Sequence, residues 1–497
     1  MEKLAIFELG YNLKLTIVKT KNGHHKVVEE VIEPLRVAED IETANLIKPK
    51  NTQDCITVLK FYRKFCETYG VTKTVAVAFN IFSQAKNQKS FMEEIYNNTG
   101  INFIVMSSED EMRNLYLGVM ELIDVSKGFI IDVQGRKTNL IKFNRRNILT
   151  SYSLDIGAVS LAEKFADKKV NADEMKAFAL AELDKANIQE SFEPETSFIG
   201  AGASLISLGR LAKKISHYSL EIENNYRVSS ELFYQVFNFT KGLDIDKTKK
   251  LKGISDERAD SLISGFAILS AIFDKFKIPE ITITTAVCAD GLISLNVVAD
   301  STDKFNDMLG TSLDNYREFS GLECENTSQV YALAIVLFKQ LKVMHKLPRY
   351  YVKPLRIAAS MYDAGKHVEN SNYAKHGFYT ILNSNLVGVS QKEILISAFI
   401  CACQDLDNLN LSEWMKYKDI LNEEDLDAVR KLGVIVKLAT ALDASRKGIV
   451  EDVSCDILGD SVIMKTIVKG DPTFEILQGM KVASDYKKVF KKFLQII

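Results

Sequence analysis

The feature that most constrains the fold is a strand–turn–strand pattern that occurs twice, about 120 residues apart. The first copy runs from Leu4 to Val18 with Gly10 and Asn12 at its centre, and the second runs from Gly128 to Phe143 around Gly135. Apolar runs interrupted by a glycine-bearing turn predict two strands joined by a tight connection. Because the spacing is far longer than that of a solenoid repeat, the two copies indicate a duplicated architecture.

Helix-like and strand-like segments alternate between and after these two copies. A helix is predicted from Gln53 to Tyr69, where Gly70 is a stop signal. Another is predicted to open at Ser108 and to run to Leu122. The remaining predicted helices cover 161–165, 172–186, 206–215 and 257–276, and the predicted strands cover 74–78 and 280–285. This alternation predicts a mixed α/β core with parallel strand pairing.

The character of the chain changes near residue 300. Amphipathic segments cover 329–345, 390–402 and 424–443, and no strand is predicted between 307 and 443. Ser390 and Glu393 form a capping-box start. A small β element is predicted over 453–470, before a final basic helix. With a polar linker at 300–312, we expect three parts: 1–124, 125–305 and 306–497.

Composition excludes several classes of partner. Lys plus Arg number 63 and Asp plus Glu number 65, so no global field would attract nucleic acid or anionic lipid, and a polyanion site must be a local patch. No apolar run approaches the roughly 18 residues of a membrane span. Because the N-terminus leads directly into a strand-like segment, we expect no signal peptide. The seven cysteines form no CxxC pair, which argues against a disulfide framework or a zinc site. We expect a cytoplasmic protein.

Four turn segments could meet around a phosphate group. They are Glu8–Asn12, Ser107–Glu111, Asp132–Thr138 and Gly200–Ser204. In a two-lobed fold, hairpins offer backbone N–H groups to an anion that lies between them. Each segment alone is weak evidence, because glycine-bearing hairpins are common, but their order and spacing together are much stronger.

These segments resemble motifs of the exopolyphosphatase and guanosine pentaphosphate phosphohydrolase family, and the likeness covers nearly the whole chain. Seven segments of the family match this chain in the same order. They are D-I-G-S-N-S at 8–13, T-S-A-x-R-x-A-K-N at 79–87, S-G-E-E-E-A-R at 107–113, the Y-L-G-V of x-Y-L-G-V at 116–119, D-I-G-G-G-S-T-E-L at 132–140, L-x-I-G-A-V-R-L-x-E-x-F at 154–165 and I-S-x-E-R-A-D at 254–260. The resemblance implies an α/β fold of two duplicated ribonuclease-H/actin-like lobes, followed by a mainly helical HD-like C-terminal domain.

The resemblance also implies a role for each candidate residue. Glu111 would orient the attacking water as general base, and Glu8 and Asp132 would hold Mg²⁺. The substrate would be inorganic polyphosphate or a guanosine polyphosphate, and the protein would form a homodimer through its helical domain. The implied phosphate-binding residues are Gly10, Asn12, Lys86, Gly135, Arg136, Lys137, Thr138, Gly202 and Ser204.

Several of these residues have an alternative interpretation. Ser108-x-x-Glu111 also fits a capping box, so Glu111 could cap its helix, act as a base, or do both. Asp132 could be a turn-forming residue that needs no metal. Arg136 and Lys137 could be a solvated hairpin tip. The basic run 487–492 could line a polyphosphate channel or be the solvated face of a helix.

The chain departs from the family pattern in ways that weaken the site. Glu8 replaces Asp, Tyr11 and Leu13 add bulk to the first loop, and Asn139 replaces a Glu. The loop glycines are reduced in number, and the two missing family arginines are Ser83 and Ser160. Losing one electrostatic contact of this kind costs about 10²–10³ in rate. We therefore predict weak hydrolysis, or alternatively a non-catalytic sensor that kept the anion site. A nucleotide-dependent kinase of the same superfold fits the motifs less well.

The helical domain also departs from the metal-binding pattern that the resemblance implies. Tyr362 stands where the family has a histidine beside Asp363, and Gln404 replaces a later histidine. His345, His376 and Asp443 remain. Because the His-Asp pair is broken, we expect no working metal site there.

Overall fold

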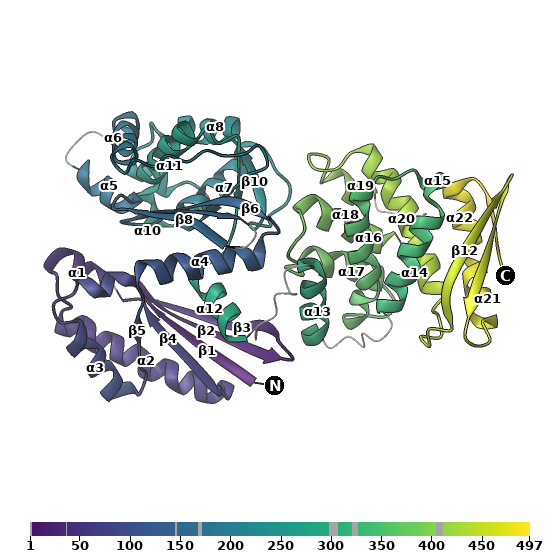
Figure 1. Cartoon of the computed structure of the whole chain (residues 1–497), viewed down its shortest axis with the longest axis horizontal. Coiled ribbons are helices and arrows are strands. Elements are labelled where there is room, and N and C mark those ends of the chain that lie inside the picture. The colour runs from purple at the N-terminus through teal and green to yellow at the C-terminus, as the bar shows by residue number, and fades with distance from the viewer. Residues whose placement is uncertain are drawn as a thin grey trace. The chain divides into compact units, whose positions relative to one another are not determined.

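The computed structural model describes residues 2–35, 37–144, 147–166, 171–297, 307–320, 327–403 and 411–497. The chain divides into two compact units (Figure 1). The first contains Met1–Ser216 and Ile222–Met308, and the second contains His217–Glu221 and Leu309–Ile497. Residues 300–306 of the predicted linker lie outside the described residues.

The first sheet of the N-terminal unit has the strand order β3-β2-β1-β4-β5. Strands β1 (Glu2–Leu9), β2 (Asn12–Lys21) and β3 (His24–Pro34) form an antiparallel meander, and β4 (Lys73–Ala78) and β5 (Ile104–Val105) continue the sheet in parallel. The predicted β1–β2 pair and the strand over 74–78 are confirmed. The meander's third strand was missed because its sequence is charged and largely exposed, as is common for an edge strand.

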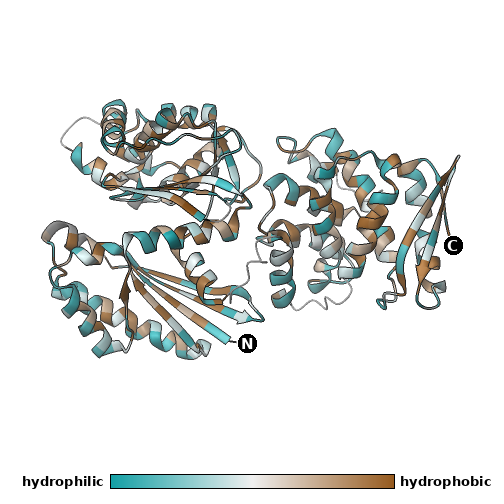
Figure 2. Cartoon of the chain, viewed as in Figure 1, coloured by the Kyte–Doolittle hydropathy of each residue, from teal (hydrophilic) through white to brown (hydrophobic). Residues whose placement is uncertain are grey.

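The second sheet has the order β10-β11-β9-β6-β7-β8. Strands β6 (Lys127–Val133), β7 (Thr138–Asn144) and β8 (Asn147–Leu154) form another antiparallel meander. Strand β9 (Ser197–Ala201) pairs in parallel with β6, β11 (Glu280–Ile283) pairs in parallel with β9, and β10 (Tyr226–Ser229) closes the edge. Both sheets therefore place a parallel strand beside the first strand of a meander. Figure 2 shows hydrophobic residues gathered along the strands of both sheets.

Helices cover both sheets, and one predicted helix is broken. The segment 257–276 falls in two helices, which end at Ala259 and begin at Leu262, and Ser261 N–H bonds to Arg258 O at 3.2 Å in the turn between them. The helical elements of this unit are α1 (Val37–Ala44), α2 (Pro49–Tyr69), the 3₁₀ helix η1 (Asn80–Gln84), α3 (Gln88–Thr99), α4 (Ser108–Leu122), α5 (Ala158–Lys164), α6 (Ala172–Lys185), α7 (Ala203–Ile215), α8 (Ser230–Thr240), α9 (Ile245–Lys249), α10 (Asp256–Ala259), α11 (Leu262–Phe276) and α12 (Cys288–Val297).

Helices α4 and α12 join the two halves of this unit. Apolar residues of α4 pack with those of β6, β7 and β9, whereas apolar residues of α12 pack with those of β1, β2 and β4 (Figure 1). The two helices approach closely at Gly118 and Gly291. A Cβ on Gly291 would lie 2.0 Å from Asn114 O, and one on Gly118 would lie 2.7 Å from Val287 O. Only glycine allows this approach of the two backbones.

The second unit is mainly helical up to residue 441. Its helical elements are α13 (Met308–Ser320), α14 (Thr327–Gln340), α15 (Lys342–His345), η3 (Arg349–Tyr351), α16 (Val352–Ser360), η4 (Ala364–His367), α17 (Tyr373–Leu382), α18 (Gln391–Ala402), α19 (Leu411–Met415), α20 (Glu423–Ala441), α21 (Thr473–Lys481) and α22 (Ala483–Phe490). The described part of 307–443 contains no strand, as predicted. The predicted Ser390–Glu393 capping box is confirmed.

The C-terminal β element is larger than predicted. Strands β12 (Val450–Leu458), β13 (Ser461–Val468) and β14 (Phe493–Ile496) form one sheet in that order. The predicted basic helix is present as α22, whose last turn carries Lys487 and Lys488. The chain does not end in that helix, because β14 follows it and pairs in parallel with β13. Burial of Leu494 and Ile496 against this unit's core stabilises the strand. Among the described helices of both units, none has the length and apolar character needed to cross a bilayer.

Candidate functional site

Glu111 does not cap its helix. The N-cap of α4 is Ser107, whose hydroxyl accepts Asp110 N–H at 3.0 Å, while Asp110 Oδ2 accepts Ser107 N–H at 3.2 Å. The predicted Ser108–Glu111 capping box was therefore wrong by one residue. Glu111 lies in the same turn, but its carboxylate accepts the backbone N–H of Asn80, which follows strand β4. The capping requirement is met without Glu111, so its carboxylate is left for another role.

The environment of Glu111 suits acid–base chemistry near neutral pH. Burial raises its pKa to about 7, and nearby Asp132 adds to this rise, while the Asn80 N–H and the Lys137 ammonium oppose it. A carboxyl whose pKa lies near the working pH can accept a proton without being permanently protonated. Strongly perturbed pKa values of this kind concentrate at functional sites.

Asp132 lies buried at the end of β6. Its Oδ2 accepts hydrogen bonds from Gln134 Nε2 at 2.7 Å and from Asn139 Nδ2 at 3.4 Å. Burial raises its pKa to about 6 against these two bonds. Gly202 has φ +82°, and a Cβ there would lie 2.5 Å from Asp132 Oδ1. The predicted residues Asp132 and Gly202 therefore meet, and both the backbone and the carboxylate require glycine at 202.

The turn between β6 and β7 is used mainly to cap helix α5. Gln134 N–H closes the turn on Lys137 O at 2.9 Å. The carbonyl of Gly135 accepts the N–H groups of Val159 and Ser160 at 2.7 and 3.0 Å. These two N–H groups are among the donors that a helix N-terminus would otherwise offer to an anion. In this chain they are satisfied by the loop itself.

The two predicted cations of this turn have different surroundings. Lys137 Nζ donates to Ser108 Oγ at 3.4 Å and lies near Glu111. Arg136 instead forms a forked ion pair with Glu163 of α5, at 2.8 and 2.9 Å. The structure therefore brings Lys137 to Glu111, while Arg136 already pairs with a carboxylate.

Two further predicted phosphate-binding residues lie beside Asp132 and bond to backbone. The buried Thr138 hydroxyl donates to Ile156 O at 2.7 Å. Ser204, at the start of α7 after Gly202, donates to Val133 O at 3.3 Å. Both hydroxyls thus anchor the loops that surround Asp132.

The turn between β1 and β2 is packed against Phe79, a residue that is not among the predicted site residues. Gly10 N–H bonds to Asn12 O at 2.9 Å, and a Cβ on Gly10 would lie 2.9 Å from the Phe79 ring. Leu13 belongs to the core of the first sheet, and Tyr11 is 43% exposed. The bulk over Gly10 therefore comes from Phe79, which stands at a Thr position of the family motif.

Glu8 lies buried at the end of β1 and contacts the start of α12. It accepts the backbone N–H of Ala289, and burial raises its pKa to about 7, with Lys14 opposing the rise and Asp290 adding to it. Asp290 accepts Val287 N–H at 2.8 Å, and burial raises its pKa to about 6. Asp290 lies outside the motifs from which the candidate residues are predicted. The available signal was an Asp-Gly pair opening an apolar helix just after a predicted strand.

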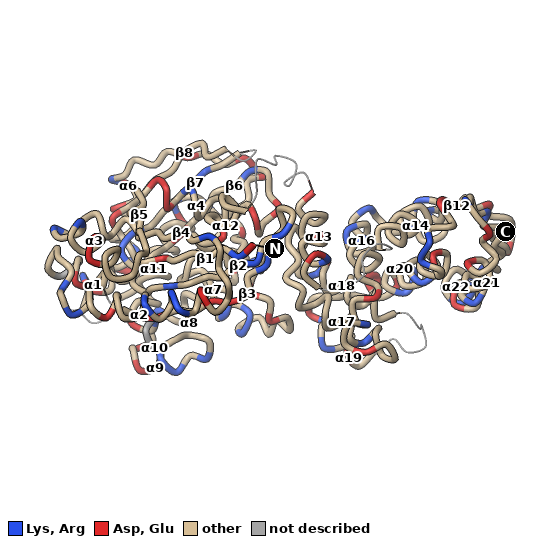
Figure 3. Tube along the Cα trace, turned by 90° about the horizontal axis from the view of Figure 1, so that it is seen from below, with Lys and Arg blue, Asp and Glu red and all other residues tan. Residues whose placement is uncertain are grey.

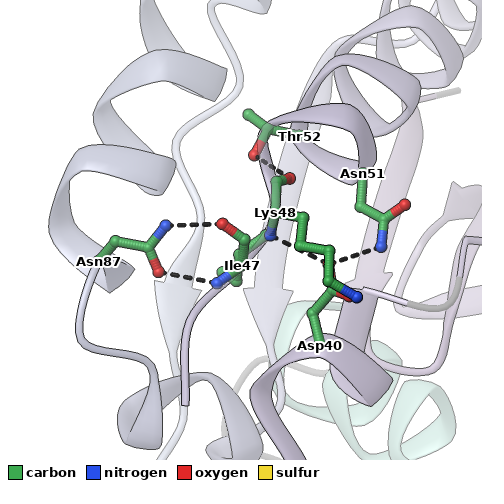
Figure 4. Close-up of polar contacts among 6 residues, drawn as sticks. All are labelled: Asp40, Ile47, Lys48, Asn51, Thr52 and Asn87. Atoms are coloured by element: carbon green, nitrogen blue, oxygen red, sulfur yellow. Dashed lines mark hydrogen bonds and ion pairs between the residues drawn. The ribbon is translucent and has the colours of Figure 1, made fainter. Parts of the chain in front are cut away.

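Lys86 lies on an exposed turn that a separate polar cluster holds in place. Its backbone N–H donates to Asn45 O at 2.9 Å. The next residue, Asn87, exchanges two hydrogen bonds of 2.8 Å with the backbone of Ile47 (Figure 4). Lys48 Nζ pairs with Asp40 at 2.8 Å in the same cluster. The structure fixes the backbone around Lys86 and leaves its side chain exposed.

Residues of the family's metal pattern in the second unit are engaged in other contacts. Asp363 lies 3.6 Å from Arg446, Asp443 accepts Gly448 N–H at 2.9 Å, and the two ring nitrogens of His345 bond to backbone. His376 Nε2 lies 3.6 Å from Glu369, and Gln404 lies outside the described residues. Over the whole described part of the chain, no three His, Cys, Asp or Glu side chains are grouped as a metal site.

Comparison with known proteins places this geometry in a family. Residues 16–297 match the model of the Ppx/GppA phosphatase family, and residues 312–469 match its domain III. The chain belongs to the Ppx/GppA phosphatase family. A guanosine-5'-triphosphate,3'-diphosphate pyrophosphatase of Pseudoalteromonas translucida is 23% identical over 401 residues, which are 78% of this chain and 78% of that protein.

Solved structures of Ppx/GppA proteins share the actin-like fold of the N-terminal unit. A family member from Aquifex aeolicus matches with a TM-score of 0.54 at 21% identity, covering 60% of this chain and 97% of its own. An exopolyphosphatase from Cytophaga hutchinsonii matches with a TM-score of 0.53 at 15% identity, covering 60% of this chain and 100% of its own. The predicted family and its actin-like fold are confirmed.

The buried Glu8 carboxyl predicts an unusual dependence of stability on pH. Because its pKa is raised from 4.5 to about 7 in the folded protein, the folded state binds this proton more tightly than the unfolded state. This contribution to stability is therefore present below about pH 4.5 and is lost as the pH rises to about 7. Glu8→Gln should raise the melting temperature of the N-terminal unit at pH 8, but not at pH 4. The exposed Glu33→Gln is the matched control, and equal shifts for both variants would contradict the assignment.

Proposed function

We propose that this chain is a phosphoanhydride hydrolase that releases the terminal phosphate of inorganic polyphosphate or of a guanosine polyphosphate. The observation that carries the proposal is the position of Glu111. It is free of helix capping, it is held by Asn80 N–H, and it lies near Lys137 and Asp132 with a pKa raised to about 7. Such a carboxylate can accept a proton from the attacking water while Lys137 offsets phosphoryl charge.

We propose that Mg²⁺ binds through two carboxylates with different neighbours in the structure. Glu8 lies near Lys14 and Asp290, whereas Asp132 lies near Gln134, Asn139 and Glu111. Glu8 and Asp132 offer carboxylate oxygens, which are the ligands that Mg²⁺ prefers, and both carboxyl groups have pKa values raised by burial. A nearby cation would favour their ionised forms. Mg²⁺ is often held by one or two carboxylates together with substrate phosphates, so a three-residue protein cluster is not required. The ion would supply charge neutralisation at the phosphates.

We expect the hydrolysis to be slow. The Gly135 carbonyl occupies the N-terminal donors of α5, Arg136 is paired with Glu163, and Phe79 packs over Gly10. The first two contacts engage hydrogen-bond donors that would otherwise be available to a phosphate group. The third fills space beside the first loop. Since phosphoryl transfer depends on positioning and charge stabilisation, such losses lower the rate directly.

The Phe79 contact also favours a second candidate function. A protein that binds polyphosphate or a nucleotide without cleaving it would tolerate the Phe79 ring against Gly10, provided that Lys137 still attracts the anion. Figure 3 shows Lys and Arg interspersed with Asp and Glu along the chain, so the anion site on this interpretation is local.

Four finer expectations accompany the proposal. The shared strand order of the two sheets supports the interpretation that the lobes at 1–124 and 125–305 are duplicated. The match of residues 312–469 to domain III of the family supports a C-terminal domain of the family type, for which we infer an HD-like fold. A homodimer through that domain and a cytoplasmic location remain predictions.

Phosphate release tests the proposal. The purified chain with Mg²⁺ should release orthophosphate from long-chain polyphosphate or from guanosine pentaphosphate, and EDTA should abolish the release. Gel electrophoresis should show polyphosphate shortening from its ends. Tight polyphosphate binding by calorimetry with no release from either substrate would reject hydrolysis and favour the sensor function.

A further inference from the structure

A chain of hydrogen bonds joins Glu111 to Lys137 through two residues that have no assigned role. Asn80 donates its backbone N–H to Glu111. Its side-chain Nδ2 donates to Met106 O at 3.2 Å, and its Oδ1 accepts the hydroxyl of Ser108 at 3.1 Å. Ser108 Oγ in turn accepts from Lys137 Nζ at 3.4 Å.

The direction of every bond in this chain is fixed by chemistry. Lysine can only donate, so Ser108 Oγ must accept from Lys137 and must use its single proton elsewhere. That proton goes to Asn80 Oδ1, which is the acceptor because Nδ2 faces the Met106 carbonyl. Only a side chain with one donor end and one acceptor end can serve both partners. An amide at position 80 meets this requirement, whereas a carboxylate does not.

These hydrogen bonds connect segments that are far apart in sequence. Asn80 follows strand β4, Ser108 opens helix α4, and Lys137 lies in the turn between β6 and β7. Asn80 also stands beside Phe79, whose N–H donates to Leu9 O at 2.9 Å. The same short segment therefore contacts the first loop, the carboxylate and, through Ser108, the second loop.

We propose that Asn80 and Ser108 are positioning residues that hold the Glu111 carboxylate and the Lys137 ammonium in a fixed arrangement around the terminal phosphoryl group. This inference rests on the proposed function, because it assigns the geometry of the same site. Asn80 orients Glu111 through its backbone, and its side chain keeps Ser108 turned toward Lys137. The anion that this arrangement recognises is a phosphoryl group with an adjacent water.

A double-mutant cycle tests the Ser108–Lys137 step through binding alone. Affinity for a defined short-chain polyphosphate is measured by calorimetry for wild type, Ser108→Ala, Lys137→Met and the double variant. Because Ser108 acts through Lys137, its loss should weaken binding about threefold in the wild-type background and not at all in the Lys137→Met background. Additive losses, or no binding by any of the four proteins, would overturn this step.

A second variant tests the Asn80 step without requiring turnover. Asn80→Asp keeps the shape and the backbone N–H but places a negative charge near Glu111 and removes the donor to Met106. We expect the titration of Glu111, followed by NMR of ¹³C-labelled glutamate and assigned with Glu111→Gln, to move up by about one pH unit. Asn98→Asp, an exposed Asn bonded to its own helix, is the control. An unmoved titration in Asn80→Asp would overturn the Asn80 step.

The two tests separate this inference from the proposed function. If wild type releases no phosphate but both the cycle and the titration behave as expected, the positioning roles stand and hydrolysis is rejected. If wild type hydrolyses polyphosphate while Ser108→Ala changes neither KM nor the cycle, and Asn80→Asp leaves the acid limb of the pH–rate profile in place, hydrolysis stands and the positioning roles are rejected.

Discussion

Replacing Glu111 by Gln should lower phosphate release from polyphosphate by about 10²–10⁴-fold, the range that general-base catalysis typically contributes. The substitution keeps the size of the side chain and removes its ability to take a proton. Because the backbone N–H of Asn80 can still donate to the amide oxygen, the local fold should persist. Affinity for polyphosphate should change little, since Lys137 remains in place.

The matched control is Glu109→Gln in the same helical turn, where the side chain is exposed. Initial rates of phosphate release at saturating polyphosphate compare the two variants with wild type. The rate of wild type should also rise with pH as Glu111 ionises around pH 7. An equal small change for Glu109→Gln and Glu111→Gln would remove Glu111 from the mechanism.

Gly291→Ala should destabilise the N-terminal unit by about 3 kcal/mol, the upper end of what overpacking usually costs. The new methyl group would lie 2.0 Å from Asn114 O, and a backbone atom cannot move aside as a flexible side chain does. Helices α4 and α12 would have to separate, which also displaces Glu111 and Asp290 at their N-terminal ends. Activity should therefore fall together with stability.

Two probes can report on the two units of the chain. The only tryptophan, Trp414, is buried in the second unit, where its ring centroid lies 4.8 Å from that of Phe399. The circular dichroism signal contains the helices of both units, whereas Trp414 fluorescence reports on the second unit alone. In urea, Gly291→Ala should therefore move part of the circular dichroism transition to lower denaturant and leave the Trp414 fluorescence transition in place. Gly242→Ala, where an added methyl meets no atom within 4 Å, is the control. A shift as large for Gly242→Ala would contradict this account of the helix crossing.

Local chemistry explains which parts of the fold were predictable. The β1–β2 and β6–β7 pairs and the Ser390 capping box depend on neighbouring residues, so their sequence patterns were sufficient. Strand β3 depends on pairing with β2, and its exposed charged residues carry no apolar pattern. Strand β14 is four residues long and is stabilised by long-range pairing with β13. Such tertiary contacts leave little trace in a local sequence window.

The residues of the candidate site were likewise predictable only where a local sequence motif marks them. Motifs predict Glu111, Asp132 and Gly202 as candidates, because the order of these motifs along the chain is distinctive. Partners that come from distant segments were missed, since Phe79 over Gly10 and Asp290 near Glu8 are contacts between separate elements. The register of the α4 cap was misjudged because Ser107 and Ser108 are both good cap residues, each followed three residues later by a carboxylate. The fold chose the first pair and left Glu111 for Asn80.

The most direct measurement is hydrogen exchange of the whole chain with and without a non-hydrolysable polyphosphate analogue. If the loops converge around one anion, exchange should slow together in residues 8–12, 79–86, 107–111, 132–138 and 200–204. Protection confined to the basic C-terminal segment 487–492, or no protection at all, would contradict the account.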